Sequence, residues 1–251
     1  MSQIFTTVLF QPLLNALVFL YNVIPGNDLG IAIILLTVLI KLLLYPLTHQ
    51  TIKSQKAMQE LQPKMEEIKK KYKDDKENQA KAMMAMYKEN KVNPMSSCLP
   101  LLVQLPFLIA VYQVFNTGLK SESLQLLYPF IANPGHLNPI SLGFFDLGHS
   151  NMILAAITGL AQFWQTKMLS TKMPPKEVRK SEGAKDEDMM AIMNKQMLYM
   201  MPVMTFVIGL SLPSGLVLYW FAMTILTVAQ QYLMFNKKKT DVVVVEENKL
   251  N

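Results

Sequence analysis

Charged and apolar residues alternate in long blocks along the chain, and this separation restricts the fold more than any other feature of the sequence. Composition alone does not decide, because 51% apolar residues in 251 could also build one soluble core. Five apolar blocks are about as long as a membrane-spanning helix requires. The pattern therefore predicts an all-α, polytopic membrane protein with a five-helix transmembrane core. The blocks are 30–48, 95–117, 151–169, 196–212 and 214–235.

The distribution of lysine and arginine predicts how the chain lies in the membrane. Region 49–94 carries eleven of these residues, 167–195 carries seven and the tail after Phe235 carries four, whereas 118–150 carries only Lys120. Basic loops concentrate on the cytoplasmic side of membranes. We therefore expect an N-terminus outside the membrane and a C-terminal tail in the cytoplasm.

The first apolar segment, 4–24, permits two interpretations. Its polar residues Thr7, Gln11, Asn15 and Asn22 lie in one narrow arc of a helix, which suits a helix lying in the membrane interface. A sixth spanning helix is the alternative, but five spans already alternate correctly with the basic loops. The expected organisation is an extracytoplasmic interfacial helix (1–28), the five-helix core (29–235) and a basic cytoplasmic tail (236–251).

Region 49–93, inserted in this core, is long enough to have its own structure. Leu61, Met65, Ile68 and Tyr72 recur at helical spacing, and a second helix is expected through Ala80, Met83, Met84 and Tyr87. The pattern predicts a charged cytoplasmic helical hairpin. A flexible basic linker is the alternative.

Lys41 is the one basic residue inside the first expected span. A lysine in mid-membrane costs about 2.5–3.5 kcal/mol on insertion scales. Its long side chain could reach toward the interface, which is an ordinary way to avoid that cost. A functional role is the second interpretation, and polar neighbours favour it.

Polar residues align on one face of several expected spans, and such stripes together would enclose a hydrated groove. Ordinary hydrogen bonding between helices is the alternative for any single stripe. The five spans contain no Asp or Glu, which argues against a proton relay or a cation pump. With one cysteine and no phosphate-binding or metal-binding motif, we expect no cofactor, no metal and no catalytic residue. The candidate groove residues are Lys41, Thr37, Gln104, Gln162, Gln165, Trp220, Thr224 and Gln231.

Several longer motifs resemble those of the YidC insertases, whose relatives include the mitochondrial Oxa and chloroplast Alb proteins. The resemblance covers about residues 25–235 and keeps the order and spacing of the motifs. The matching stretches are LLLYPLT at 42–48, LQPK at 61–64, YK at 87–88, KVNP at 91–94, CLPLLVQLP at 98–106, PSGLVLY at 213–219 and QQ at 230–231.

The resemblance implies a membrane protein insertase of the bacterial plasma (inner) membrane, in a short form without a large periplasmic domain. It implies a hydrophilic groove open to the cytosol and to lipid, with Thr37 and Trp220 at positions that meet substrate. The expected partners are nascent membrane proteins, the ribosome, the Sec translocon and membrane lipid, with no specific nucleic acid sequence. The expected function is not enzymatic.

One departure from the family concerns Lys41, where arginine is usual. Lysine keeps the positive charge but lacks the planar guanidinium group, which can form two parallel hydrogen bonds with a carboxylate. The alternative functions are a small-solute or ion transporter and a passive subunit of a larger assembly.

Overall fold

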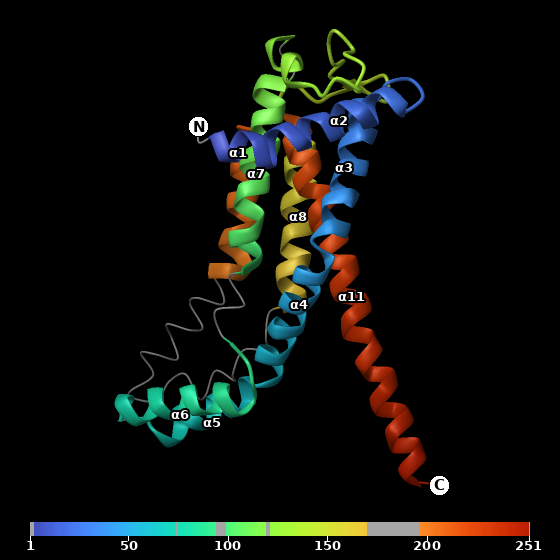
Figure 1. Cartoon of the computed structure of the whole chain (residues 1–251). Helices are drawn as coiled ribbons and strands as arrows, with labels where there is room; N and C mark the ends of the chain where they lie inside the picture. The colour runs from blue at the N-terminus through green and yellow to red at the C-terminus, as the bar shows by residue number, and fades with distance from the viewer. Residues whose placement is uncertain (1–2, 74, 94–98, 119–120, 170–195, 251) are drawn as a thin grey trace. The chain divides into compact units, whose positions relative to one another are not determined.

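A computed structural model describes residues 3–73, 75–93, 99–118, 121–169 and 196–250, and these are almost entirely helical (Figure 1). The predicted all-α class of membrane protein is confirmed; most of the predicted basic loop 167–195 lies outside the described residues. The elements are α1 (Gln3–Phe5), η1 (Thr6–Phe10), α2 (Gln11–Val23), α3 (Leu29–Leu43), α4 (Tyr45–Glu60), α5 (Gln62–Lys71), α6 (Lys76–Glu89), α7 (Leu99–Gly118), η3 (Ser121–Leu126), β1 (Ile140–Ser141), β2 (Phe145–Asp146), α8 (Met152–Leu169), η5 (Gln196–Met200), α10 (Met201–Gly209) and α11 (Ser214–Leu250).

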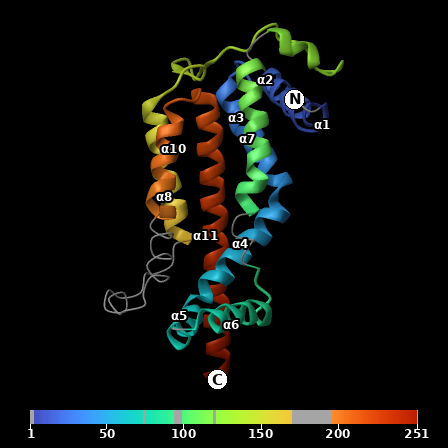
Figure 2. The ribbon, with the colours of Figure 1, turned by 90° about the vertical axis from the view of Figure 1, so that its left-hand side faces the viewer.

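The chain divides into two compact units. Unit 1 comprises residues 1–45, 101–162 and 202–227, and unit 2 comprises the remainder. In unit 1, helices α3, α7, α8, α10 and the first part of α11 run alongside one another, while α1, η1 and α2 run crosswise at one end (Figures 1 and 2). The core of this unit includes Leu14 and Val18 of α2, Ile33 of α3, Phe115 of α7 and Leu216 of α11.

Small residues allow α8 and α10 to pack closely in unit 1 (Figure 2). A Cβ at Gly159 of α8 would lie 3.1 Å from the carbonyl oxygen of Pro202, and one at Gly209 would lie 3.0 Å from Cβ of Ala155. In membranes the hydrophobic effect does not drive helices together, because lipid tails are as apolar as the side chains. Helices associate instead by close packing, which small residues allow.

The polar stripe of α2 contacts the segment that connects α7 to α8. Gln11 and Asn15 both donate to the carbonyl oxygen of Leu126, at 3.1 Å, and Asn15 also accepts the N–H of Tyr128 at 2.6 Å. Asn22 donates to the carbonyl oxygen of Ala132 at 2.7 Å. The polar side chains of α2 therefore form hydrogen bonds with backbone groups of the protein. Their spacing in the sequence alone could not indicate these partners.

Length and apolar composition single out fewer spans than the five expected. Among the described residues, two helices meet both criteria, Gln3–Val23 and Ser214–Phe235, and α3 with α4 makes a third if they count as one broken span. The apolar stretches of α7 and α10 are shorter, and α8 carries Gln162, Gln165 and Lys167. Five spans therefore stay a prediction.

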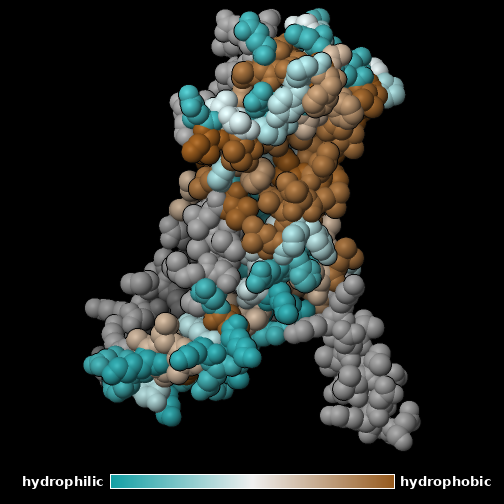
Figure 3. Space-filling view, viewed as in Figure 1, coloured by the Kyte–Doolittle hydropathy of each residue, from teal (hydrophilic) through white to brown (hydrophobic). Residues whose placement is uncertain are grey.

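Unit 2 contains an antiparallel helix pair, α5 and α6. Leu61, Met65 and Met86 are buried between the two helices, and the Tyr87 hydroxyl lies 3.7 Å from Sδ of Met65. Met84, which was expected on the second helix, lies on α6 and is exposed. The remaining surface of the pair is largely hydrophilic (Figure 3), as the many lysines require.

Asp28 joins the start of α3 to the β1–β2 hairpin. Its carboxylate accepts the N–H of Ile31 at 3.0 Å and thereby caps α3. The same carboxylate accepts the Ser141 hydroxyl and the N–H of Leu142, both at 2.6 Å. Partial burial raises the pKa of Asp28, but the hydrogen bonds from Leu142, Ser141 and Ile31 outweigh it and hold the pKa below its usual value.

We expect Asp28→Ala to lower the free energy of unfolding by about 1–2 kcal/mol, because a helix cap and two further hydrogen bonds are lost. Since the folded-state pKa is lowered, this contribution is present above the ordinary pKa of 3.8 and is lost as the pH falls below it. Thermal unfolding in detergent at several pH values measures both effects. A gap between wild type and variant that stays constant from pH 7 to pH 3 would contradict the assignment.

Candidate functional site

Lys41 lies in the last turn of α3, which ends at Leu43. The sequence interpretation placed it well inside a span that continued to Thr48. A new helix instead begins at Tyr45, directly before Pro46. Proline has no N–H to donate to the carbonyl group four residues earlier and its ring clashes with that group, so it interrupts a helix, whereas it is tolerated in the first turn of a new one. The ammonium group therefore lies near the carboxyl end of a helix, where the exposed carbonyl groups favour a positive charge.

The Lys41 side chain is 8% exposed and reaches α11. Its Nζ donates to the Thr227 hydroxyl at 2.9 Å, and that hydroxyl donates to the carbonyl oxygen of Met223 at 2.7 Å. An ammonium has three N–H donors. Among the described residues no carboxylate pairs with Lys41, so a buried positive charge is left without a neutralising partner.

Gln104 of α7 also contacts α11. Its Nε2 donates to the Tyr219 hydroxyl at 2.7 Å, and the Tyr219 side chain is almost completely buried. A hydrogen bond of this kind between helices is the ordinary interpretation weighed for a single polar stripe. Gln104 therefore has a structural partner whatever else it contacts.

Four further candidates belong to unit 1. Thr37 is 0% exposed and its hydroxyl donates to the carbonyl oxygen of Ile33, and Thr224 is buried and donates to that of Trp220. Such bonds to the preceding turn satisfy the hydroxyl within its own helix. Trp220 itself is half-buried, as is Gln162 on α8.

The remaining two candidates, Gln165 and Gln231, fall in unit 2, whereas Lys41 belongs to unit 1. Gln231 is buried, and its Oε1 has no hydrogen-bond partner among the described residues. Its neighbour Gln230 exchanges hydrogen bonds with Thr48 at 3.3–3.4 Å.

Two residues near the candidates were not selected from the sequence. Thr227 follows Thr224 and Trp220 at helical spacing, and that spacing was the available signal. Tyr219 gave no such signal, because a tyrosine in an apolar block is as often a core residue. Both residues hold side chains of other helices and so define where the polar face of α11 lies.

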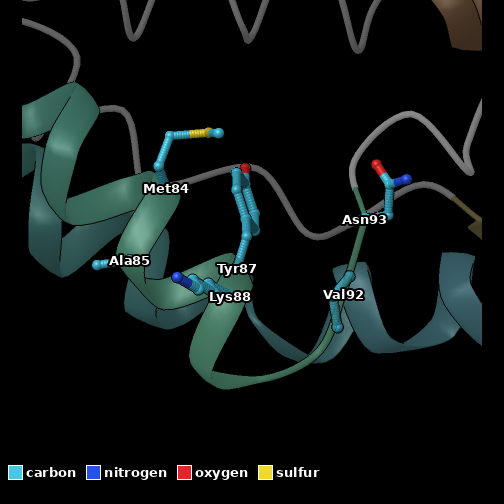
Figure 4. A pocket seen from close by; sticks show the side chains of 6 residues that line it. All are labelled: Met84, Ala85, Tyr87, Lys88, Val92 and Asn93. Atoms are coloured by element: carbon cyan, nitrogen blue, oxygen red, sulfur yellow. The ribbon is translucent and has the colours of Figure 1, made fainter.

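A separate pocket of about 410 Å³ lies on α6 in unit 2 (Figure 4). Met84 and Tyr87 extend from the helix toward the following segment, which contributes Val92 and Asn93, and Lys88 lines the pocket as well. It contains none of the candidate groove residues. In the part of the chain that the structure describes, no group of three or more His, Cys, Asp or Glu side chains could hold a metal ion.

Helices with apolar exposed faces, close packing at small residues and a buried lysine define a polytopic helical membrane protein. The chain belongs to the family described as the 60Kd inner membrane protein, whose model matches residues 19–241. The resemblance to the YidC insertases is thereby confirmed.

The chain is similar to three proteins named membrane protein insertase YidC. That of Pelobacter propionicus is 37% identical over 238 residues, which cover 94% of this chain and 40% of the relative. The protein of Geobacter sulfurreducens is 38% identical, and the match covers 90% of this chain and 36% of the relative. The protein of Geotalea uraniireducens is 39% identical, and the match covers 90% of this chain and 37% of the relative. The chain thus spans about two fifths or less of the length of these relatives.

Proposed function

We propose that this chain is a membrane protein insertase, which moves nascent transmembrane segments from the cytosol into the lipid bilayer. The observation that carries the proposal is the buried Lys41 ammonium, which donates to a neutral hydroxyl and has no carboxylate partner among the described residues. The names of the relatives and the family membership support the same function.

In this mechanism Lys41 attracts an acidic or polar flank of the incoming segment. Moving such a flank into hydrocarbon without a partner is expensive. A positive charge held at the end of α3 lowers that cost, and the apolar helix then enters lipid because its own burial is favourable. No covalent step is needed, so the proposed function is not enzymatic.

The groove itself is part of the proposal. Thr37, Trp220 and Thr224 stand on the same two helices as Lys41 and Thr227, and Gln104 and Gln162 come from α7 and α8 of the same unit. Gln165 and Gln231 extend the set on sequence spacing alone.

The orientation and partners are proposed on charge. The lysines of 49–93 and of the tail favour a cytoplasmic location for both, and the crosswise α1–α2 segment suits an extracytoplasmic interface (Figure 1). The basic helix pair is then placed to meet the ribosome, whose RNA is polyanionic, or the Sec translocon. Bacterial inner membrane is the proposed location.

Rescue of bacterial cells depleted of their own insertase tests the function directly. We expect the chain to restore growth and the insertion of a short, Sec-independent membrane protein. Failure of rescue by a correctly inserted, stable chain would favour a passive assembly subunit. Solute uptake by vesicles that contain only this protein would favour the transporter.

A further inference from the structure

The β1–β2 hairpin carries a cluster of exposed apolar side chains at its tip. Leu142 is 66% exposed and Phe144 is 79% exposed, and Ile140 is exposed as well. The segment 139–145 contains no charged residue. Isolated exposed apolar residues are ordinary, but three within five residues on a protruding turn form a small apolar surface that needs an explanation.

The tip is held in a strained conformation. Leu142 has φ +51° and Gly143 has φ +81°, and the N–H of Phe144 donates to the carbonyl oxygen of Ser141 at 3.2 Å. Glycine adopts positive φ freely, whereas a bulky residue such as leucine pays a cost there. The hydrogen bond from Leu142 N–H to Asp28 keeps the backbone in place, so the exposed leucine is fixed rather than free to fold inward.

The hairpin packs against the first turn of α3. Ser141 lies so close to Gly30 that a Cβ at Gly30 would overlap its side chain. Ser141 thus faces α3, and because neighbouring strand residues point to opposite sides, Ile140 points away from it. The tip therefore lies at the level at which α3 begins and points outward from that helix.

The exposed apolar surface of α3 starts at the same level. Ile31 is exposed, followed one turn later by Ile34 and Leu35, and apolar side chains dominate this face of unit 1 in Figure 3. Ile31 is three residues beyond Asp28, or about 4.5 Å along the axis. In a membrane protein this surface faces lipid, so the hairpin tip continues a lipid-facing surface outward to the headgroup region.

We propose that the β1–β2 hairpin tip, residues 140–144, is an interfacial lipid anchor that inserts Leu142 and Phe144 beside the first turn of α3. Leucine and phenylalanine are suited to the boundary between headgroups and acyl chains, about 5–10 Å into the interface. The absence of charge from 139–145 predicts binding that depends little on anionic lipid. The Asp28 bonds fix the depth of the anchor relative to α3.

Depth-dependent fluorescence quenching tests the anchor in the full-length chain. The natural Cys98 is replaced by serine, and a polarity-sensitive label is attached to Phe144→Cys or, separately, to Leu142→Cys. The matched control is His136→Cys, an exposed position in the same connecting segment. The proteins are reconstituted in neutral phosphatidylcholine vesicles at low protein density, with spin-labelled lipids carrying the quencher at the headgroup or at acyl carbon 5 or 12.

We expect lipids labelled at the headgroup or at carbon 5 to quench the labels at 142 and 144 at least about twofold more than the label at 136, with little quenching from carbon 12, as interfacial insertion requires. Iodide supplied on both sides of the membrane should quench the control label preferentially. Equal iodide access at 136, 142 and 144 would overturn the proposal. Protection that appears only at high protein density, with energy transfer between labelled copies, would overturn it in favour of contact between two chains.

Discussion

Replacement of Lys41 by alanine or by glutamate is expected to slow the insertion of a short membrane protein with an acidic flank, whereas Lys41→Arg retains it. The reason is electrostatic, because two unit charges 4 Å apart interact by about 4 kcal/mol at an effective dielectric constant of 20. Loss of that attraction should slow insertion by at least about tenfold, and glutamate should be worse than alanine because it repels the flank. Insertion into vesicles containing the purified protein measures the rate.

Two comparisons separate charge from packing. Lys41→Met keeps most of the side-chain volume without the charge and is expected to fail like alanine. Lys81→Ala removes an exposed lysine of α6, which pairs with Glu77 at 2.6 Å, and is expected to insert normally. If alanine, methionine and glutamate at position 41 all insert the substrate as well as wild type, the role of the charge is refuted.

Thr227 provides a finer test of the same site. Thr227→Val removes the hydroxyl that accepts the bond from Lys41 while keeping the shape of the side chain. The charge stays, so insertion should fall much less than in Lys41→Ala. A loss as large as that of Lys41→Ala would show that the position of the ammonium matters as much as its charge.

The position of Lys41 in the sequence was informative, but the helix expected around it was too long. Counting to the end of the apolar block placed the lysine seven residues from the end of a helix at Thr48. The helix ends at Leu43 because Pro46 cannot donate the next hydrogen bond of the helix and its ring clashes with the preceding turn. Pro46 was the local signal for the true end of the helix, whereas the bond to Thr227 depends on how α3 meets α11, which no local pattern determines.

The polar residues of α2 illustrate the opposite limit. Periodicity correctly placed Gln11, Asn15 and Asn22 on one face of a helix. Their partners, the backbone groups of Leu126, Tyr128 and Ala132, are more than 100 residues away in the chain. An amphipathic pattern predicts which face of a helix is polar. It does not predict whether the polar side chains form hydrogen bonds with water, with lipid headgroups or with another part of the backbone.

The β1–β2 hairpin could not be predicted from an alternating pattern, because each strand has only two residues. Its stability comes instead from Asp28, a residue in the loop before α3. Long apolar helices could therefore be predicted from composition and helical periodicity. Short irregular elements that are held by distant side chains could not be predicted in this way.

Gly215→Ala is expected to lower the free energy of unfolding by about 1–3 kcal/mol, the usual cost of overpacking a filled core. Gly215 stands in the first turn of α11, where the N–H groups of Ser214 and Gly215 donate to the carbonyl oxygens of His149 and Leu147, both at 2.9 Å. These bonds fix the backbone. A Cβ at Gly215 would overlap the buried Phe115 ring of α7, so α11 or the ring must move. Thermal unfolding in detergent measures the change.

A double-mutant cycle identifies the cause of that loss. Phe115→Leu removes the ring edge that the new methyl group would meet, at its own cost of packing. If the overlap is responsible, the two substitutions together should cost less than the sum of their separate costs, with a coupling of about 0.5–3 kcal/mol. Strict additivity would contradict the overlap and would attribute the loss to the backbone of the α10–α11 turn. Because α11 also carries Thr227, a shift of its first turn should weaken substrate insertion in Gly215→Ala and restore it in the double variant, which links the packing of this turn to the proposed site at Lys41.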